Sequence, residues 1–268
     1  MSALREAKGF VLDLDGTLIQ RTPTGHTPIA GAKELLAAIR YSGRPLMIFT
    51  NASHVAPSVL AAELREGGLD VSDDEVLTPV CCAISFLGAR HPGAGVLGFC
   101  TPATHDRLAK AGIRLVGLDD SVDVVFVAHP STFDFAELEH AARAITRGAP
   151  LLTASYVPAY AGANGPIFSR GAMVTAALAK VGRARPAIVG KPSRPAVREI
   201  VARLGLPSRD LVVIGDDVAL DIALGNLGRS HTVLVQTGIT GTASLQRLPA
   251  LQRPGETVAS VGDLVGVI

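Results

Sequence analysis

The 268-residue sequence contains no tryptophan, and aromatic residues make up only 4% of it. Proteins that bind nucleic acids usually combine a basic stripe with aromatic side chains on which bases stack. Here the net charge is +1, and both signs of charge are spread along the chain. The composition therefore argues against nucleic acid as a partner.

Long apolar runs and paired cysteines are also missing. No run is long enough to span a bilayer, and the opening residues "MSALREAKGF" lack the apolar core of a signal peptide. The three cysteines, Cys81, Cys82 and Cys100, are odd in number and form no C-x-x-C pair. We therefore expect a soluble cytoplasmic protein that makes no membrane contact and whose thiols are buried and reduced.

Apolar strand-like runs alternate with helical patterns along most of the chain. The patterns predict strands at 10–14, 45–50, 122–128, 149–154, 186–190, 210–216 and 231–236, and helices at 31–43, 57–68, 134–148, 194–204 and 218–227. Continuous Val/Ile/Leu strands separated by helices are typical of a parallel sheet covered on both faces. We expect an α/β fold with a doubly wound, Rossmann-like core. The main irregular stretch, residues 156–171, is predicted to be a functional loop.

Polar residues follow four of the predicted strands, at the positions where ligands of a doubly wound sheet gather. They are Asp13 and Asp15 after the first strand, Thr50 and Asn51 after the second, Lys191 after residues 186–190, and Asp216, Asp217 and Asp221 after residues 210–215. Carboxylate oxygens suit Mg²⁺, which takes waters and substrate phosphate as its other ligands. A lysine provides a point charge for a phosphoryl oxygen. The set predicts a magnesium and phosphate site, with a turn at Gly16 separating the first two acids.

The motifs "DLDGT", a strand ending at Thr50, "GKP" and "GDDVALD", in this order, resemble those of the haloacid dehalogenase superfamily of phosphotransferases. The long stretch between the second and third motifs is similar to the large α/β cap of subclass IIA. That subclass contains 4-nitrophenylphosphatase, phosphoglycolate phosphatase and pyridoxal phosphatase. The resemblance implies a core formed by residues 1–80 and 187–268, with a cap domain of residues 81–186 inserted into it.

The resemblance also implies catalytic roles for the matching residues. Asp13 would be the nucleophile that becomes an aspartyl phosphate. Asp15 would protonate the leaving oxygen and then deprotonate the attacking water. Lys191 would neutralise charge between Asp13 and the transferring phosphoryl group, which Thr50 and Asn51 would bind.

The resemblance also implies a Mg²⁺ ion. Its protein ligands would be the carboxylates of Asp216 and Asp13 and the backbone carbonyl of Asp15. Asp217 or Asp221 would support the metal through its waters or neighbouring groups. Asp217 has a competing role, because an aspartate at this position also caps a following helix.

The predicted cap departs from the pattern of similar proteins. The segment "TASYVP" stands where many have "TN-x-D", and "VAHPSTFD" stands where a "GLDR"-like segment is familiar. Tyr156, Tyr160 and Asn164 are candidate substrate contacts in the irregular stretch, whereas Phe168 there could equally pack. Ser53 and His54 follow the second motif. A helix-capping role for Ser53 and a surface role for His54 compete with a catalytic role.

The resulting expectation is Mg²⁺-dependent hydrolysis of a small phosphorylated metabolite through an aspartyl phosphate. Phosphosugars, phosphoglycolate, pyridoxal phosphate and nucleoside monophosphates all remain open as substrates. One alternative is a phosphotransferase or mutase that passes the phosphoryl group to a hydroxyl, and another is a non-catalytic phosphometabolite-binding regulator. A dehalogenase is disfavoured, because Asp15 supplies an acid that dehalogenation does not need. The resemblance leaves a cap-mediated homodimer open.

Overall fold

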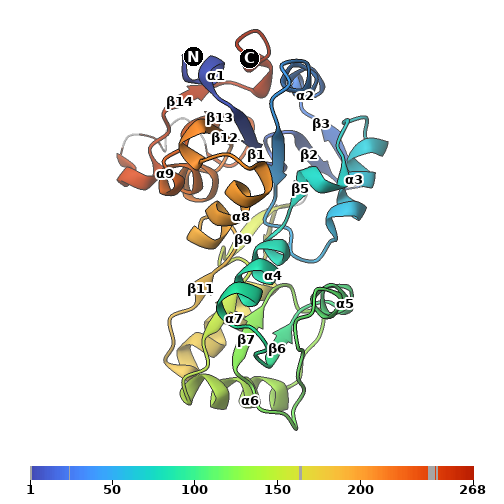
Figure 1. Ribbon diagram of the computed structural model, residues 1–268, viewed down its shortest axis with the longest axis vertical. Helices are drawn as coiled ribbons and strands as arrows, with labels where there is room; N and C mark the ends of the chain where they lie inside the picture. Colours follow the sequence, from blue (N-terminus) through green and yellow to red (C-terminus); the bar gives the residue numbers. More distant parts are fainter. Residues whose placement is uncertain (1, 24, 163–164, 241–244, 246) are drawn as a thin grey trace. The chain divides into compact units, whose positions relative to one another are not determined.

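The computed structural model describes residues 2–23, 25–162, 165–240, 245 and 247–268. The chain divides into two compact units. Figure 1 shows its helices and strands, coloured from blue at the N-terminus to red at the C-terminus. Unit 1 comprises Met1–Thr50, Pro57–Leu77 and Pro192–Ile268, and unit 2 comprises Asn51–Ala56 and Thr78–Lys191. The range predicted for the cap, residues 81–186, lies inside unit 2.

Unit 1 is built on a six-stranded parallel sheet. Its strands, in spatial order, are β14 (Glu256–Val258), β13 (His231–Val235), β12 (Leu211–Gly215), β1 (Gly9–Leu12), β4 (Leu46–Phe49) and β5 (Val76–Leu77). The central strand β1 is buried along its whole length and pairs with β12 on one side and β4 on the other. Its apolar residues match the continuous pattern of a doubly covered strand. The predicted α/β fold with a parallel sheet is confirmed.

Helices connect the strands of unit 1. They are α1 (Ser2–Glu6), α2 (Ala32–Tyr41), α3 (Pro57–Glu66), α8 (Arg194–Leu204) and α9 (Ala223–Gly228), with a π-helical turn η3 (Val218–Ile222) and the 3₁₀ turns η1 (Asp73–Glu75), η2 (Ser208–Asp210), η5 (Ala250–Gln252) and η6 (Val261–Leu264). From β1 the strand order runs toward β4 and β5 in one direction, and from β12 toward β13 and β14 in the other. Because parallel crossovers are right-handed, this order puts α2 and α3 on one face of the sheet and α9 on the other.

A short hairpin follows the "DLDGT" motif directly. Its strands are β2 (Ile19–Thr22) and β3 (Gly25–Pro28), which pair antiparallel. The chain reaches the hairpin through a tight turn in which Gly16 has φ +84°, a conformation that favours glycine. The turn predicted at Gly16 is therefore present, whereas the hairpin was not predicted.

Unit 2 contains a four-stranded parallel sheet in the order β11 (Ala187–Ile188), β8 (Leu151–Thr153), β7 (Val124–Val127) and β6 (Val96–Phe99). Its helices are α4 (Pro79–Arg90), α5 (Pro102–Lys110), α6 (Phe135–Thr146) and α7 (Arg170–Gly182). Apolar residues of α6 and α7 pack on β6, β7 and β8 to form the core of this unit (Figure 1).

Two predictions for this region need correction. The stretch 156–171 is not one irregular loop, because β9 (Ala159–Gly162) and β10 (Gly165–Phe168) form an antiparallel hairpin that leads into α7. These four-residue strands contain Gly, Ala and Pro and carry no alternating apolar pattern, so the sequence does not reveal them. The strand predicted at 186–190 is β11, which pairs with β8 of unit 2 and not with the core sheet. A two-residue strand carries too little sequence to identify its partner.

The three cysteines are buried, as predicted, and in the described part of the chain none of them forms a disulfide. Burial raises the pKa of the Cys100 thiol to about 12, so it stays protonated at neutral pH. Among the described residues, no helix has the length and apolar character needed to cross a membrane.

Candidate active site

Three carboxylates meet beyond the carboxyl ends of the neighbouring strands β1 and β12. Asp13 follows β1, and its N–H donates to the Ile214 carbonyl at 2.8 Å, which continues the sheet ladder. Asp216 follows β12, and Asp221 lies on the π-helical turn η3. One carboxylate oxygen of each of the three lies within 4.8 Å of the others, and their exposed fractions are 9%, 3% and 2%.

The carboxylate of Asp216 is held in a close-fitting cradle of backbone. The N–H of Ile239 donates to its Oδ2 at 2.7 Å. A Cβ atom at Gly16 would lie 2.6 Å from the same oxygen, and one at Gly238 would overlap it. Only glycine at these two positions leaves room for the carboxylate in its present orientation. The loop after β13 therefore fixes a side chain that follows β12.

The two candidate supporting acids, Asp217 and Asp221, have different surroundings. Asp217 caps η3, because its Oδ1 accepts a hydrogen bond from the Ala219 N–H at 2.7 Å. Asp221 is buried in the carboxylate cluster, and its Oδ2 accepts from the Asp217 N–H at 3.1 Å. A Cβ at Gly215 would overlap Asp221. The structure thus favours Asp221 as the acid that supports a metal and gives Asp217 a capping role.

The cluster formed by Asp13, Asp216 and Asp221 has the donor set of a hard divalent cation. Three carboxylates this close repel one another unless a cation or protons neutralise them. Mg²⁺ is bound in proteins by one or two carboxylates, with waters and substrate phosphate completing the coordination. The donor chemistry and the glycine cradle around Asp216 therefore fit the predicted metal.

Asp15 lies outside this cluster and has a different partner. Its Oδ1 accepts a hydrogen bond from Nε of Arg21 at 2.5 Å, and the two side chains are 43% and 38% exposed. Arg21 comes from β2 of the hairpin. Arg21 was not among the predicted site residues, because only the unpredicted hairpin brings it back toward the "DLDGT" turn.

Lys191 is held by the side chain of Asn51, and both residues belong to unit 2. The Lys191 N–H donates to Asn51 Oδ1 at 3.0 Å, and Asn51 Nδ2 donates to the Lys191 carbonyl at 3.1 Å. Asn51 Nδ2 also donates to Ser155 Oγ at 3.4 Å. The preceding Gly190 N–H donates to the Ala154 carbonyl at 3.0 Å. The Asn51 amide therefore positions the Lys191 backbone, a role that the sequence analysis did not give it.

We expect Asn51→Ala to lower kcat/KM for 4-nitrophenyl phosphate about tenfold to a hundredfold, because two hydrogen bonds that place Lys191 are lost. Asn226→Ala is the matched control. Asn226 Nδ2 likewise donates to two backbone carbonyls, those of Leu251 and Arg253, both at 2.9 Å. Both variants should lose similar thermal stability, but only the first should lose turnover. Equal kcat/KM losses in the two variants would contradict the positioning role.

The remaining predicted site residues are distributed over both units. Thr50 is buried directly after β4, and its N–H donates to the Leu77 carbonyl at 3.2 Å. Tyr156 precedes the β9–β10 hairpin and is 37% exposed. Phe168 is 68% exposed, which does not support the packing role considered for it. Asn164 lies outside the described residues.

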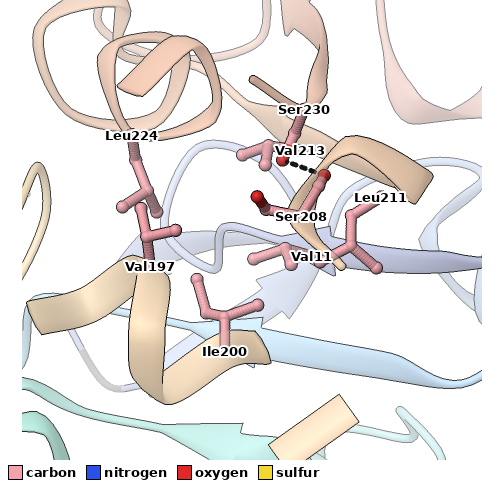
Figure 2. Close-up of a pocket in the computed structure, with 8 residues that line it drawn as sticks. All are labelled: Val11, Val197, Ile200, Ser208, Leu211, Val213, Leu224 and Ser230. Carbon is pink, nitrogen blue, oxygen red and sulfur yellow. Dashed lines mark hydrogen bonds between the residues drawn. The ribbon is translucent and has the colours of Figure 1, made fainter. Parts of the chain in front are cut away.

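One cavity in unit 1 can be set aside as a substrate site. Figure 2 shows its lining, which is formed by Val11, Val197, Ile200, Ser208, Leu211, Val213, Leu224 and Ser230. Its volume is about 10 Å³, the space of a single water molecule. The two serine hydroxyls already donate to backbone carbonyls, Ser208 Oγ to Gly228 and Ser230 Oγ to Ser208. The cavity is a packing defect of the core.

Two family profiles match the chain on either side of the segment that carries most of unit 2. Residues 10–114 match the haloacid dehalogenase-like hydrolases, and residues 188–264 match the profile described as HAD-hydrolase-like. The chain belongs to the haloacid dehalogenase-like hydrolases. Within them it is a phosphatase of subclass IIA, the group of the 4-nitrophenylphosphatase-type enzymes.

Individual relatives agree with this assignment. An acid sugar phosphatase of Staphylococcus aureus is 26% identical over 244 residues, which cover 91% of this chain and 92% of that protein. The structure of a p-nitrophenyl phosphatase from Archaeoglobus fulgidus superposes with a TM-score of 0.86 at 27% identity, covering 98% of this chain and 100% of the other. The structure of a glycerol phosphate phosphatase from Mycobacterium tuberculosis, solved with magnesium, superposes with a TM-score of 0.87 at 27% identity. The superposition covers 98% of this chain and 77% of the other.

Proposed function

We propose that this phosphatase hydrolyses small phosphate monoesters in a Mg²⁺-dependent reaction that passes through an aspartyl phosphate on Asp13. The observation that carries the proposal is the cluster of Asp13, Asp216 and Asp221 at the ends of β1 and β12, with oxygens within 4.8 Å of one another. The magnesium found with the M. tuberculosis relative supports the choice of metal.

Asp13 attacks the phosphorus atom of the monoester through a carboxylate oxygen, and the bond from phosphorus to the leaving oxygen breaks. Asp15, in its protonated form with the ion pair to Arg21 released, gives a proton to that oxygen, so the product leaves as a neutral alcohol. Asp15, now a carboxylate, takes a proton from a water molecule that attacks the phosphorus of the aspartyl phosphate. Inorganic phosphate leaves, and both side chains return to their initial states.

Other residues supply position and charge. Asp13, Asp216 and Asp221 would hold Mg²⁺, which supplies positive charge that offsets the negative charge developing on the phosphoryl oxygens. We assign Lys191 to the same phosphoryl group, with its backbone fixed by Asn51. Thr50 at the end of β4 completes the proposed phosphoryl site. Positioning and electrostatic stabilisation are the main requirements of phosphoryl transfer, so this inventory is sufficient.

The proposal is tested by phosphate release from a panel of phosphometabolites and 4-nitrophenyl phosphate. The protein is first treated with EDTA and dialysed, and is then assayed with and without added Mg²⁺. We expect release to be lost without the metal and restored with it. Full activity of the metal-free protein would contradict the mechanism. Transfer to an added alcohol in preference to water would indicate the phosphotransferase alternative, and tight binding without release would indicate a regulator.

The region that precedes the β9–β10 hairpin is proposed to contact substrate through Tyr156. We expect Tyr156→Ala to change the ranking of phosphometabolites by kcat/KM more than it changes turnover of 4-nitrophenyl phosphate, since a minimal aryl ester makes few remote contacts. Tyr41→Ala is the control, because Tyr41 lies on α2 of unit 1 and is 97% exposed. An identical ranking in both variants would remove Tyr156 from the substrate site.

A further inference from the structure

Unit 2 contains a group of three basic side chains that the proposed mechanism does not use. The rings of His54 and His129 lie with their centroids 4.9 Å apart and are tilted by 41°. The positive charge of Arg170 acts on His129 as well. The three residues come from three separate segments of the chain, so their proximity is a product of the fold and not of sequence spacing.

Each of the three segments is fixed by local bonding. His54 lies on the segment Asn51–Ala56, which is hydrogen-bonded to α5 on both sides of this histidine. Thr104 Oγ1 donates to the Ser53 carbonyl at 3.2 Å, and Arg107 Nη1 donates to the Val55 carbonyl at 3.4 Å. This anchoring holds the backbone on both sides of His54. Its position is therefore set by α5 and not by a free loop.

His129 and Arg170 are brought together by the packing of α7 on the end of β7. His129 comes two residues after β7, and a Cβ at Gly171 would overlap the carbonyl of Ala128. Glycine at this position therefore lets the first turn of α7 start against the backbone beside His129. Arg170 opens that turn, and its Nη1 donates to the Ser131 carbonyl at 3.5 Å.

The electrostatics of the group favour an anion. The pKa of His129 is lowered, first by partial burial and then by the positive charges of His54 and Arg170. An anion placed between these side chains would relieve the repulsion and favour the protonated imidazole.

One member of the group, His54, is also close in sequence to the residue that holds the Lys191 backbone. His54 follows Asn51 by three residues, so at most about 11 Å of extended chain separates it from the residue that holds the Lys191 backbone. We propose that His54, His129 and Arg170 form a second anion subsite that binds a carboxylate or second phosphate carried by the phosphate-monoester substrate. This inference rests on the proposed function, because Lys191 is taken to bind the transferring phosphoryl group.

The test compares substrates that differ in the second anion alone. 3-Phosphoglycerate and glycerol 3-phosphate share a three-carbon frame and differ in a carboxylate, and fructose 1,6-bisphosphate and fructose 6-phosphate differ in a phosphate. For each pair we take the ratio of kcat/KM for the substrate with the second anionic group to kcat/KM for the substrate without it. We expect this ratio to be about ten or more for at least one pair in the Mg²⁺-loaded protein. The pair with the larger ratio identifies the second anion as a carboxylate or a phosphate.

Variants then locate the effect. Arg170→Gln and His129→Asn should each lower the ratio of the preferred pair at least about fivefold, and Arg170→Lys should retain much of it, because the charge remains. Arg147→Gln, at the exposed C-terminal cap of α6 in the same unit, removes one positive charge elsewhere and should leave the ratio unchanged. Thermal melting confirms that each variant is folded, and His54→Gln replaces any variant that is not.

The pH dependence gives a second readout. The charged groups that act on His129 are His54, on the segment before α3, and Arg170, on α7. Because both lower its pKa, the ratio should rise as the pH falls from 8 through and below 6.5, where His129 gains its proton. His129→Asn should flatten this rise. The titration of the transferring phosphate affects both members of a pair and cancels in the ratio. The pH dependence is measured on the 3-phosphoglycerate pair, because a second phosphate titrates at about pH 6 whereas a carboxylate stays ionised over this range.

The outcomes separate the two proposals. If the protein hydrolyses 4-nitrophenyl phosphate but shows equal kcat/KM within both pairs, the subsite is overturned and the phosphatase function stands. The subsite is also overturned if the protein prefers the substrate with the second anionic group but no substitution at His54, His129 or Arg170 alters that preference. If no monoester is hydrolysed at all, the proposed function has failed instead.

Discussion

Replacing Asp13 with asparagine is expected to abolish phosphate release, with kcat lowered about 10⁴-fold or more. An amide oxygen is a poor nucleophile toward phosphorus, so no covalent intermediate forms. The measurement is the initial rate with 4-nitrophenyl phosphate and saturating Mg²⁺. Thermal melting should show that the variant is folded, because asparagine has nearly the same shape and the backbone bond from Asp13 N–H to Ile214 is retained.

The matched change at Asp15 should have a different signature. Nitrophenolate is a good leaving group that needs little protonation, so Asp15→Asn should slow the first step only mildly. The second step should be severely slowed, since water must lose a proton to Asp15. The variant should therefore accumulate phosphoenzyme, visible as one added phosphoryl group by intact mass. We expect that group to map to Asp13.

Arg21→Gln is the control that separates two consequences of changing Asp15. Asp15→Asn removes a carboxylate and also breaks the ion pair with Arg21. Arg21→Gln breaks the same pair but keeps the carboxylate. The pair is more than a third exposed and is worth about 0.2–1 kcal/mol. Arg21→Gln should therefore turn over without accumulating phosphoenzyme. A phosphoryl group on Ser, Thr or His, or one that persists in Asp13→Asn, would show that the nucleophile is a different residue.

The acids of the carboxylate cluster at the ends of β1 and β12 were predictable because two signals coincide. Asp13 and Asp216 each end a buried apolar strand, and parallel strands of one sheet bring their carboxyl ends to the same edge. Run length and composition locate such strands without any knowledge of their partners. The pairing of β1 with β12 then places the two acids side by side. The choice between Asp217 and Asp221 was left open, because it depends on the π-helical turn that follows β12.

Features that depend on contacts distant in sequence were not predictable. The bonds from Asn51 to Lys191 join residues 140 positions apart, and nothing in either local sequence announces them. The two-residue strand before Lys191 could not be assigned to a sheet from its own residues. Arg21 and His129 are similar cases, since a short hairpin and the packing of α7 on β7 determine their neighbours. Local pattern thus locates strand ends, whereas long-range packing decides which side chains meet there.

The glycine cradle around Asp216 leads to the second large expected effect. In Gly238→Ala the new Cβ would overlap Asp216 Oδ2, so the carboxylate must move away from the position that the Ile239 N–H now holds. We expect the affinity for Mg²⁺ to fall about tenfold to a hundredfold, the range typical when a group that orients a ligand is disturbed. Activity at limiting Mg²⁺ should fall by a similar factor, and high Mg²⁺ should recover part of it.

Mg²⁺-dependent thermal stabilisation measures this affinity without relying on catalysis. A cation that binds only the folded chain adds about 2.7 kcal/mol at a concentration a hundred times its Kd. Raising the melting temperature to the same degree should therefore need at least tenfold more Mg²⁺ in Gly238→Ala than in the unmodified chain. Gly266→Ala is the control in the same unit, because a Cβ there meets no atom within 4 Å, and it should match the unmodified chain. Asp216→Asn removes a ligand charge outright and should respond to Mg²⁺ still more weakly. An unchanged Mg²⁺ response in both Gly238→Ala and Asp216→Asn would mean that the cation, if bound, is held elsewhere than at the ends of β1 and β12.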